Sequence, residues 1–296
     1  MFRCILWGTG KVFYENISII RYHEIVNNIC VVGLTADKVI FDEIAGWKFI
    51  RKEELYTISF DLIIIMSDRF LQEIEDEAVG MGVDESAIIS YRALKIPPID
   101  LKKYMVIRNN PPSIFSNNCW GGVTYHSLGM KFTSPLINLF MSDADYFKLL
   151  NNPKYYMDEK LYFEKEGYDE NQNMNYPICT CGDIHLYFNH YKNFDAANYF
   201  WEKRKARINW SNLFIMMYTQ NYDLAMQFVE LPYKKKICFV PFPTDKEALH
   251  FVDFYEKEKM KGMPFNKVII GMAKGIYPYY KVVDLICDGK IEKLGR

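Results

Sequence analysis

The sequence predicts an α/β protein with two domains, and three observations lead to this prediction. Short apolar runs alternate with segments of helical spacing over the first ninety residues. A pair of glycines follows the first apolar run, and the run "FDLIIIMS" (60–67) is apolar almost throughout. A strand buried on both faces has such a composition, and strand–helix alternation favours a parallel sheet covered by helices. We therefore expect a Rossmann-like doubly wound parallel sheet, followed by a second α/β domain with a mixed sheet.

The first half supplies the elements of the doubly wound sheet in order. Apolar runs predict strands, and apolar residues three and four positions apart predict helices. We expect strands at 2–8, 28–34, 46–50, 60–67 and 86–91, and helical segments at 11–22, 52–55 and 68–82. Two proline pairs, Pro97-Pro98 and Pro111-Pro112, then suit a connector. This places a Rossmann-like nucleotide-binding-type domain at 1–98 and a second domain at 103–296.

The second half is less regular but also alternates. We expect strands at 134–141, 182–188, 212–218, 234–242 and 266–272, and helices at 142–157, 195–208 and 245–262. Ser142 is a suitable cap for the first of these helices. The polar stretch "EKEGYDENQNMN" (164–175) is expected to be a mobile loop.

Charge and cysteine content exclude several classes of protein. Lys plus Arg total 36 and Asp plus Glu total 37, so the net charge of −1 gives no general reason to expect nucleic acid as a partner. No apolar run approaches the roughly 20 residues of a membrane span, and the chain opens without the cleavage-site pattern of a signal peptide. Seven cysteines without paired spacing indicate free thiols in a reducing, cytoplasmic setting.

Gly8 and Gly10 lie between the first strand and the first helix, in "LWGTGKVF". Glycines permit a tight turn, and the free N–H groups of a helix N-terminus can bind a phosphate. The predicted nucleotide- or phosphate-binding residues are Gly8, Thr9, Gly10 and Lys11. The alternative is that these residues only turn the chain. Phe13 stands where the dinucleotide fingerprint needs a small residue and Asp37 comes late for its acidic residue, which argues against NAD.

The stretch "SNNCWGG" (116–122) combines two amides, a thiol, an indole and two glycines. Amides donate and accept hydrogen bonds, glycines let a backbone approach a ligand or take positive φ, and an indole can stack on a sugar. We predict a binding loop for a polar, uncharged ligand such as a hexose. Its residues would be Asn117, Asn118, Trp120, Gly121 and Gly122. The alternative is a loop whose amides satisfy their own backbone, with Trp120 in the core.

Cys119, in the same stretch, could be a nucleophile with His126 or His190 as its base. The alternative, a buried small hydrophobe, describes most free cysteines. We favour that alternative because nothing in the sequence indicates a lowered thiol pKa.

The segment "CGDIHLYFNHY" (181–191) carries further candidates. Asp183 and His185 would share one face of a strand and could hold a metal or form an acid–base pair. His190 opens the loop before the next helix, and we prefer it to His185 as the working histidine. The predicted catalytic residues are therefore His190 and Asp183.

Two other pairs of charged residues suggest a phosphate site. Asp143-x-Asp145 follows an apolar strand, as in glycosyltransferases that hold a metal and a nucleotide diphosphate, but we favour an acidic first helical turn capped by Ser142. Arg204 and Arg207 lie one turn apart on a predicted helix. They could clamp a diphosphate or complement the end of the helix dipole.

Three segments of the second half resemble a known family. They are "SNNCWGGVTYHSLGMKFTSPLINLF" (116–140), "YPICTCGDIHLYFNHY" (176–191) and "WEKRKARIN" (201–209). They resemble a bacterial family of domains of unknown function commonly labelled exopolysaccharide biosynthesis proteins. The resemblance covers Lys103 to Thr219 and implies a pathway, without catalytic residues to carry over. Through "ILWGTGK", "VVGLTAD" and "FDLIIIMSD", the first half resembles Rossmann-like domains that precede sugar-modifying modules in bacterial surface-polysaccharide enzymes.

We therefore expect a cytoplasmic protein of exopolysaccharide or surface-polysaccharide biosynthesis that binds a sugar or nucleotide-activated donor for group transfer. Asn118, Trp120 and His190 would orient the sugar. Arg204 and Arg207 would neutralise phosphate, and His190 or Asp183 would act as the base. The alternatives are a non-catalytic nucleotide- or sugar-binding partner of such enzymes and an NAD-dependent oxidoreductase. The sequence predicts no metal ligand set, no particular cofactor and no oligomeric state.

Overall fold

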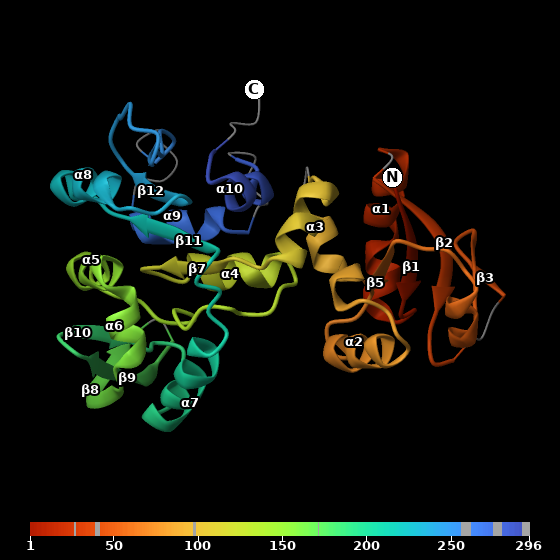
Figure 1. The fold of residues 1–296 in the computed structure, drawn as a ribbon, viewed down its shortest axis with the longest axis horizontal. Helices are drawn as coiled ribbons and strands as arrows, with labels where there is room; N and C mark the ends of the chain where they lie inside the picture. Colours follow the sequence, from red (N-terminus) through yellow and green to blue (C-terminus); the bar gives the residue numbers. More distant parts are fainter. Residues whose placement is uncertain are drawn as a thin grey trace. The chain divides into compact units, whose positions relative to one another are not determined.

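A computed structural model describes residues 1–26, 28–38, 42–96, 99–170, 172–255, 262–274 and 280–291 (Figure 1). The chain forms two compact units: Met1–Asn109 with Ser127–Met130, and Asn110–His126 with Lys131–Arg296. Each unit contains a four-stranded parallel sheet with helices, so the predicted α/β class is confirmed. The proline pair Pro97-Pro98 of the expected connector lies outside the described residues. Within the described ranges, no helix is both long enough and apolar enough to cross a membrane.

The first unit is built on a parallel sheet of order β2-β1-β5-β6. Its strands are Phe2–Trp7 (β1), Ile29–Thr35 (β2), Leu62–Ile65 (β5) and Ile88–Ser90 (β6). Helix α1 (Lys11–Ile25) leads from β1 to β2, and helix α2 (Leu71–Gly80) leads from β5 to β6. Because such crossovers are right-handed and run in opposite directions from the centre, the two helices lie on opposite faces. The sheet is doubly wound, and its strand order reverses between β1 and β5.

Alternate residues of β1 and β5 fill the two faces of this sheet. Ile5, Trp7, Ile63 and Ile65 share one core with Ala78 of α2. Since successive side chains point to opposite faces, a strand covered on both sides is apolar throughout, as predicted for 60–67. The remaining elements of the unit are β3 (Glu43–Ile44), β4 (Trp47–Lys48), α3 (Leu101–Asn109) and 3-10 turns at Lys52–Tyr56, Glu85–Ala87 and Tyr91–Lys95.

His23 of α1 is buried, and burial lowers its pKa below the usual 6.5. Its Nε2 lies 2.8 Å from the carbonyl oxygen of Leu94 and its Nδ1 lies 3.0 Å from Nδ2 of Asn28. A neutral ring that donates to Leu94 and accepts from Asn28 satisfies both contacts.

We expect His23 to make stability fall in mild acid. The unfolded chain, with the higher histidine pKa, takes up the proton first as the pH falls below 6.5. The free energy of unfolding should therefore decrease between about pH 7 and about pH 5. Chemical denaturation across this range should show a weaker pH dependence in His23→Gln, whose amide can still donate to Leu94. An equal pH dependence in both proteins would contradict the assignment.

The second unit contains two separate sheets. The parallel sheet has the order β13-β12-β11-β7, with strands Ser113–Ser116 (β7), Leu213–Tyr218 (β11), Lys236–Val240 (β12) and Leu249–Phe251 (β13). The antiparallel sheet has the order β10-β9-β8, with strands Leu161–Asp169 (β8), Met174–Cys181 (β9) and Ile184–Tyr187 (β10). Parallel and antiparallel strands thus form two sheets instead of one mixed sheet.

Helices connect and cover these sheets. They are α4 (Trp120–Ser127), α5 (Asp143–Asn151), α6 (Pro153–Asp158), α7 (Phe194–Lys205), α8 (Tyr222–Glu230), α9 (Phe265–Met272) and α10 (Val282–Asp288). Figure 1 shows the antiparallel sheet in green beside α5 and α6. As predicted, Ser142 caps α5: its hydroxyl accepts a hydrogen bond from the N–H of Asp145 at 3.1 Å.

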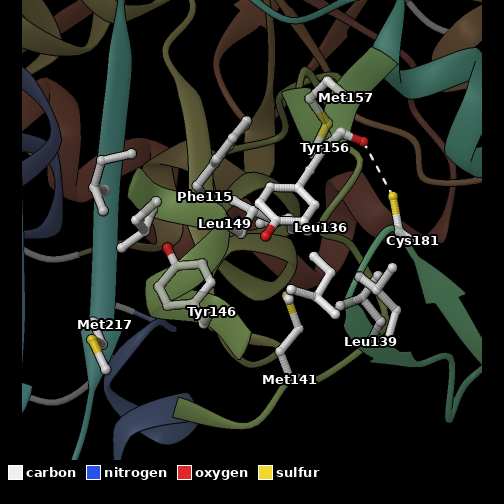
Figure 2. Packing of buried hydrophobic residues seen from close by; sticks show 14 of the residues in the cluster. Phe115, Leu136, Leu139, Met141, Tyr146, Leu149, Tyr156, Met157, Cys181 and Met217 are labelled. Atoms are coloured by element: carbon white, nitrogen blue, oxygen red, sulfur yellow. Dashed lines mark hydrogen bonds between the residues drawn. The ribbon is translucent and has the colours of Figure 1, made fainter. Parts of the chain in front are cut away.

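The two faces of the parallel sheet pack against different partners. Ile215 and Met217 of β11 belong to a core shared with α5, α8 and the antiparallel sheet. Figure 2 shows part of this core, with Tyr146 of α5 among the labelled residues. The Tyr146 hydroxyl donates to the backbone carbonyl of Met216 in β11 at 2.9 Å. On the opposite face, Phe214 stacks on Trp120 of α4.

Two predicted elements near the C-terminus are wrong. The segment 266–272 is not a strand but part of helix α9, because its buried residues Phe265, Val268, Ile269 and Met272 have helical spacing. The predicted helix at 245–262 contains strand β13, which pairs with β12. Residues 256–261 of that segment lie outside the described residues.

Two further predictions fail in the middle of the chain. The strand expected at 134–141 is reduced to one bridge between Phe140 and Tyr187. Pro135 has no N–H for a ladder, and Asn138 takes a φ of 60°, which no extended strand allows. The loop expected at 164–175 belongs instead to the hairpin of β8 and β9. Most side chains of β8 are exposed, so the strand lacks the apolar alternation that would mark it.

Candidate functional site

A pocket of about 920 Å³ opens in the first unit where β1 and β5 end. Ligands of open α/β sheets bind at this position, outside the carboxyl ends of the strands where the strand order reverses. All four residues predicted to bind a nucleotide or phosphate line the pocket: Gly8, Thr9, Gly10 and Lys11. Asp37, the late acidic residue after β2, lines it as well.

The glycine turn leaves the start of α1 open. Gly8 has a φ of 109°, and an added Cβ would lie 3.3 Å from the carbonyl oxygen of Met66, so this position needs glycine. A Cβ at Gly10 would meet no atom within 4 Å. The N-cap residue of α1 is Gly10, which has no side chain to cap the helix. The first N–H groups of the helix can therefore bind an anion in the pocket.

Charged side chains of both signs line the pocket. Of its acidic side chains, Asp37 and Glu77 share Lys52, at 2.6 Å and 2.5 Å, Asp68 lies 2.8 Å from Arg92, and Glu73 lies on the wall as well. Lys11 is exposed, and within the described part of the chain its ion pair is a 3.6 Å contact with the exposed Glu15. Surface pairs of this kind are weak. Lys11 and the positive end of the α1 dipole thus remain to attract a phosphate.

Phe13 explains the departure from the dinucleotide fingerprint. In the fingerprint, a third glycine permits close packing of helix and strand. Here Phe13 is fully buried and packs edge-on against Trp47, with ring centroids 6.0 Å apart. An aromatic contact therefore holds α1 where the fingerprint uses a small residue.

A second group of polar side chains lies where β7 meets α4 in the second unit. The Asn117 amide continues the ladder between β7 and β11: its Nδ2 donates to the carbonyl of Tyr218 at 3.0 Å, and its Oδ1 accepts from the N–H of Tyr218 at 3.2 Å. Oδ1 of Asn118 accepts from the N–H of Trp120 at 2.9 Å. These amide atoms form hydrogen bonds with backbone groups. This agrees with the alternative prediction, in which the amides of the loop satisfy the backbone instead of binding a sugar.

Trp120, Gly121 and Gly122 are all buried at the start of α4. The Trp120 ring is 0% exposed and stacks on Phe214, with centroids 6.0 Å apart. A Cβ on Gly121 would lie 2.8 Å from the Ser116 hydroxyl, so this glycine lets α4 approach β7. The three residues therefore form the helix–sheet contact and offer neither a ring face nor an open backbone to a sugar.

Cys119, between β7 and α4, lies against His190. Its Sγ is 3.5 Å from Nε2 of a histidine 71 positions later in the chain. His126, the other base considered, is seven residues along α4 and so about 10 Å away. Burial, with smaller contributions from Asp143 and Cys119, raises the pKa of Tyr218 to about 12. Cys119, His190, Tyr218 and Asp143 thus gather near the carboxyl ends of β7 and β11.

The residues of this second site lie in a part of the chain that matches a known protein family. Residues 90–285 match the family described as a domain of unknown function (DUF1919). The chain belongs to this family. Residues 1–89 match a family described as C2185-like, N-terminal. An uncharacterized protein of Haemophilus influenzae is 31% identical to the chain over 166 residues, which cover 54% of this chain and 77% of the relative.

The predicted catalytic residues do not meet in the DUF1919 domain. Asp183 lies in the turn before β10 and His190 follows its other end, so the four-residue strand, about 13 Å long, separates them. Asp183 accepts from the Tyr156 hydroxyl at 2.7 Å and from Lys148 at 2.9 Å. These hydrogen bonds lower the pKa of Asp183, which makes its carboxylate a weaker base.

Arg204 and Arg207 do not form a phosphate clamp in the DUF1919 domain. Arg204 is 8% exposed. Its guanidinium donates to the Tyr191 hydroxyl and lies 5.1 Å and 5.0 Å from the ring centroids of Phe132 and Phe200. Arg207 is exposed. The first guanidinium is used inside the fold, so the two cannot bind one diphosphate together.

Asp143 and Asp145 accept hydrogen bonds from different residues. Asp143 accepts from the Asn117 amide at 3.2 Å and from the Thr219 hydroxyl. Asp145 accepts from the N–H of His185 at 3.3 Å. Among the residues the structure describes, no three His, Cys, Asp or Glu side chains are placed to hold a metal. The pair is an acidic first turn of α5, as favoured from the sequence.

Sequence reasoning missed Tyr218 and Asn189 as members of the second site. Tyr218 ends the apolar strand β11, and Asn189 directly precedes His190. The carboxyl ends of neighbouring parallel strands meet at one edge of a sheet. A predicted pairing of β7 with β11 would therefore have placed Tyr218 beside Asn117.

Proposed function

We propose that this protein binds a nucleotide or nucleotide-activated sugar in the pocket of its first unit, as a donor for group transfer. The observation that carries the proposal is the pocket at the point of strand-order reversal, with an uncapped helix N-terminus and Lys11 on its wall. Backbone N–H groups and a lysine are the usual partners of a diphosphate. A volume of about 920 Å³ is enough for a ligand of this size.

The pathway part of the proposal rests on the family resemblance of the second half, whose family is commonly labelled exopolysaccharide biosynthesis. Surface-polysaccharide synthesis uses nucleotide-activated sugars, which agrees with a diphosphate pocket. The seven cysteines, all within the described residues, are free thiols. Free thiols suit a reducing compartment, so we propose a cytoplasmic location.

The test is a thermal-unfolding screen of the full chain against UDP-, GDP- and dTDP-sugars, with NAD as a comparison. A ligand that binds only the folded state raises stability, by about 2.7 kcal/mol at 100 times Kd. Gly10→Ala should fold, since its methyl group meets no atom within 4 Å, and should weaken nucleotide-sugar binding about tenfold or more by blocking the approach of the phosphate.

The matched control is Gly80→Ala, at the end of α2, where an added methyl group also meets no atom within 4 Å. It should leave ligand binding unchanged. Stabilisation by NAD alone would contradict the proposal, as would a nucleotide-sugar shift of the same size in Gly10→Ala. Binding without transfer to any acceptor would favour the non-catalytic binding protein.

A further inference from the structure

The turn between β7 and α4 carries a thiol with a base in contact. Sγ of Cys119 lies 3.5 Å from Nε2 of His190, within the distance of a hydrogen bond to sulfur. Cys119 is partly exposed and His190 is exposed, so a reactant can reach both. A nucleophile on a tight turn from strand to helix, with a histidine in contact, is an arrangement that covalent catalysis uses.

The protonation states suit transfer of a proton from sulfur to nitrogen. Burial raises the pKa of the Cys119 thiol to about 11, and partial desolvation lowers the pKa of His190. At neutral pH the thiol therefore holds its proton and the imidazole is free to accept it. The titratable groups around the pair are Asp169, which acts on His190, and Tyr191 and Tyr218, which lie near Cys119.

The residues next to Cys119 and His190 in the sequence each carry a buried polar atom without a hydrogen-bond partner among the described residues. Asn118 is 2% exposed, and its Nδ2 has no hydrogen-bond partner among the described residues. In Asn189, next to His190, Nδ2 lies 3.5 Å from Nε2 of His190, and the buried Oδ1 has no partner in the described part of the chain. Buried polar atoms of folded proteins are nearly always paired. A ligand bound beside Cys119 would give the Nδ2 donor of Asn118 a partner.

We propose that Cys119 takes up an acyl group from an activated ester or thioester, with His190 as its general base and Asn118 as the donor to the oxyanion. This inference goes beyond the proposed function and does not depend on the pocket of the first unit. As Sγ bonds to the carbonyl carbon, its proton passes to Nε2 of His190 and the carbonyl electrons move to oxygen. The oxyanion then re-forms the carbonyl, and the alkoxide or thiolate leaves with the proton from His190. The product is a thioester on Cys119, which water or an acceptor hydroxyl can cleave.

The surroundings favour acyl transfer over other group transfers. A single neutral amide donor fits one oxyanion on a carbonyl. Phosphoryl transfer would need cations, and the Arg204 guanidinium is already held by Tyr191 and two aromatic rings. Glycoside hydrolysis by the usual route needs a pair of carboxylates about the sugar. Asp183 lies beyond the far end of β10 from His190, and the Asp143 carboxylate is hydrogen-bonded to Asn117 and Thr219.

The test uses p-nitrophenyl acetate with the full chain. We expect a burst of one p-nitrophenolate per chain and one acetyl group on Cys119, located by peptide mass spectrometry. Cys119→Ala should abolish the burst. Cys30→Ala should keep it, because that partly exposed thiol lies on β2 in the other unit. His190→Gln should slow the burst about 100-fold, the usual contribution of a general base.

Asn118→Asp separates the oxyanion role from the fold. A carboxylate at 118 can still accept from the N–H of Trp120, as Oδ1 of Asn118 does now, but it removes the Nδ2 donor. We expect a burst about 100-fold slower at a similar unfolding temperature. An unchanged rate would remove Asn118 from the proposal.

The pH dependence of the wild-type burst distinguishes general-base catalysis by His190 from attack by free thiolate, and it needs no variant. With His190 as the base, the rate rises with pH until the imidazole is neutral, below the usual 6.5, and then levels off. Attack by free thiolate would instead keep rising toward about pH 11. The proposal is overturned by that second profile, by an acetyl group found equally on Cys30 and Cys119, or by a full-rate burst in His190→Gln.

Discussion

Trp120→Ala is expected to lower the free energy of unfolding by about 3–5 kcal/mol, as for other fully buried large aromatics. The ring is 0% exposed and stacks on Phe214, and its Nε1 donates to the Tyr280 hydroxyl at 3.2 Å. Removing it leaves a cavity between α4 and the parallel sheet, where close packing cannot re-form. Urea denaturation followed by circular dichroism would measure the loss.

Trp210→Ala is the matched control for this prediction. Trp210 is 38% exposed, its ring centroid lies 6.4 Å from that of Phe115, and Nζ of Lys154 lies 5.8 Å from the same ring. Its removal should cost no more than about 1 kcal/mol. If Trp120→Ala cost as little as Trp210→Ala while weakening the binding of a sugar, the placement of Trp120 in the core would be wrong and the sugar-stacking prediction would return.

Arg204→Ala is expected to destabilise the protein by about 3 kcal/mol. Its buried guanidinium donates to Tyr191 and lies over Phe132 and Phe200. A hydrogen bond to a charged group contributes about 1.5–3 kcal/mol, and a desolvated cation–π contact contributes about 2 kcal/mol. The two effects overlap because they involve the same group. Thermal and chemical unfolding of the variant would measure their combined loss.

Arg207→Ala provides the comparison, because it lies three residues further along the chain and is exposed. Its stability should remain within about 0.5 kcal/mol of the wild type. A phosphate clamp would produce the opposite pattern: both variants would remain stable and both would lose nucleotide affinity. That result would restore the clamp predicted from the sequence.

Features with a local cause could be predicted from the sequence. The apolar run at 60–67 became the buried strand β5, and the glycine pair became the turn before α1 with positive φ at Gly8. The Ser142 cap and the acidic first turn of α5 were also predicted. In each case the signal lies within a few neighbouring residues, because it comes from strand burial, backbone freedom or capping.

Local signals failed where they were ambiguous or absent. The short apolar run at 266–272 suits either a strand or a buried helix, and packing made it α9. The exposed strand β8 has no apolar alternation to reveal it, and only its pairing with β9 makes it a strand. Here the partner decides the conformation, and no short window of sequence contains the partner.

By itself, the sequence determined the α/β class, the glycine turn and the helix cap, since these depend on interactions between close neighbours in the chain. The tertiary structure alone decided what the polar and aromatic residues do. Trp120 and Arg204, which their local motif and helical spacing suggested for a ligand, are buried in the fold, and the length of β10 separates Asp183 from His190. The tertiary structure also brought Cys119 within 3.5 Å of His190, across 71 positions. Contacts of this range depend on strand order and crossovers, which place distant segments at one sheet edge.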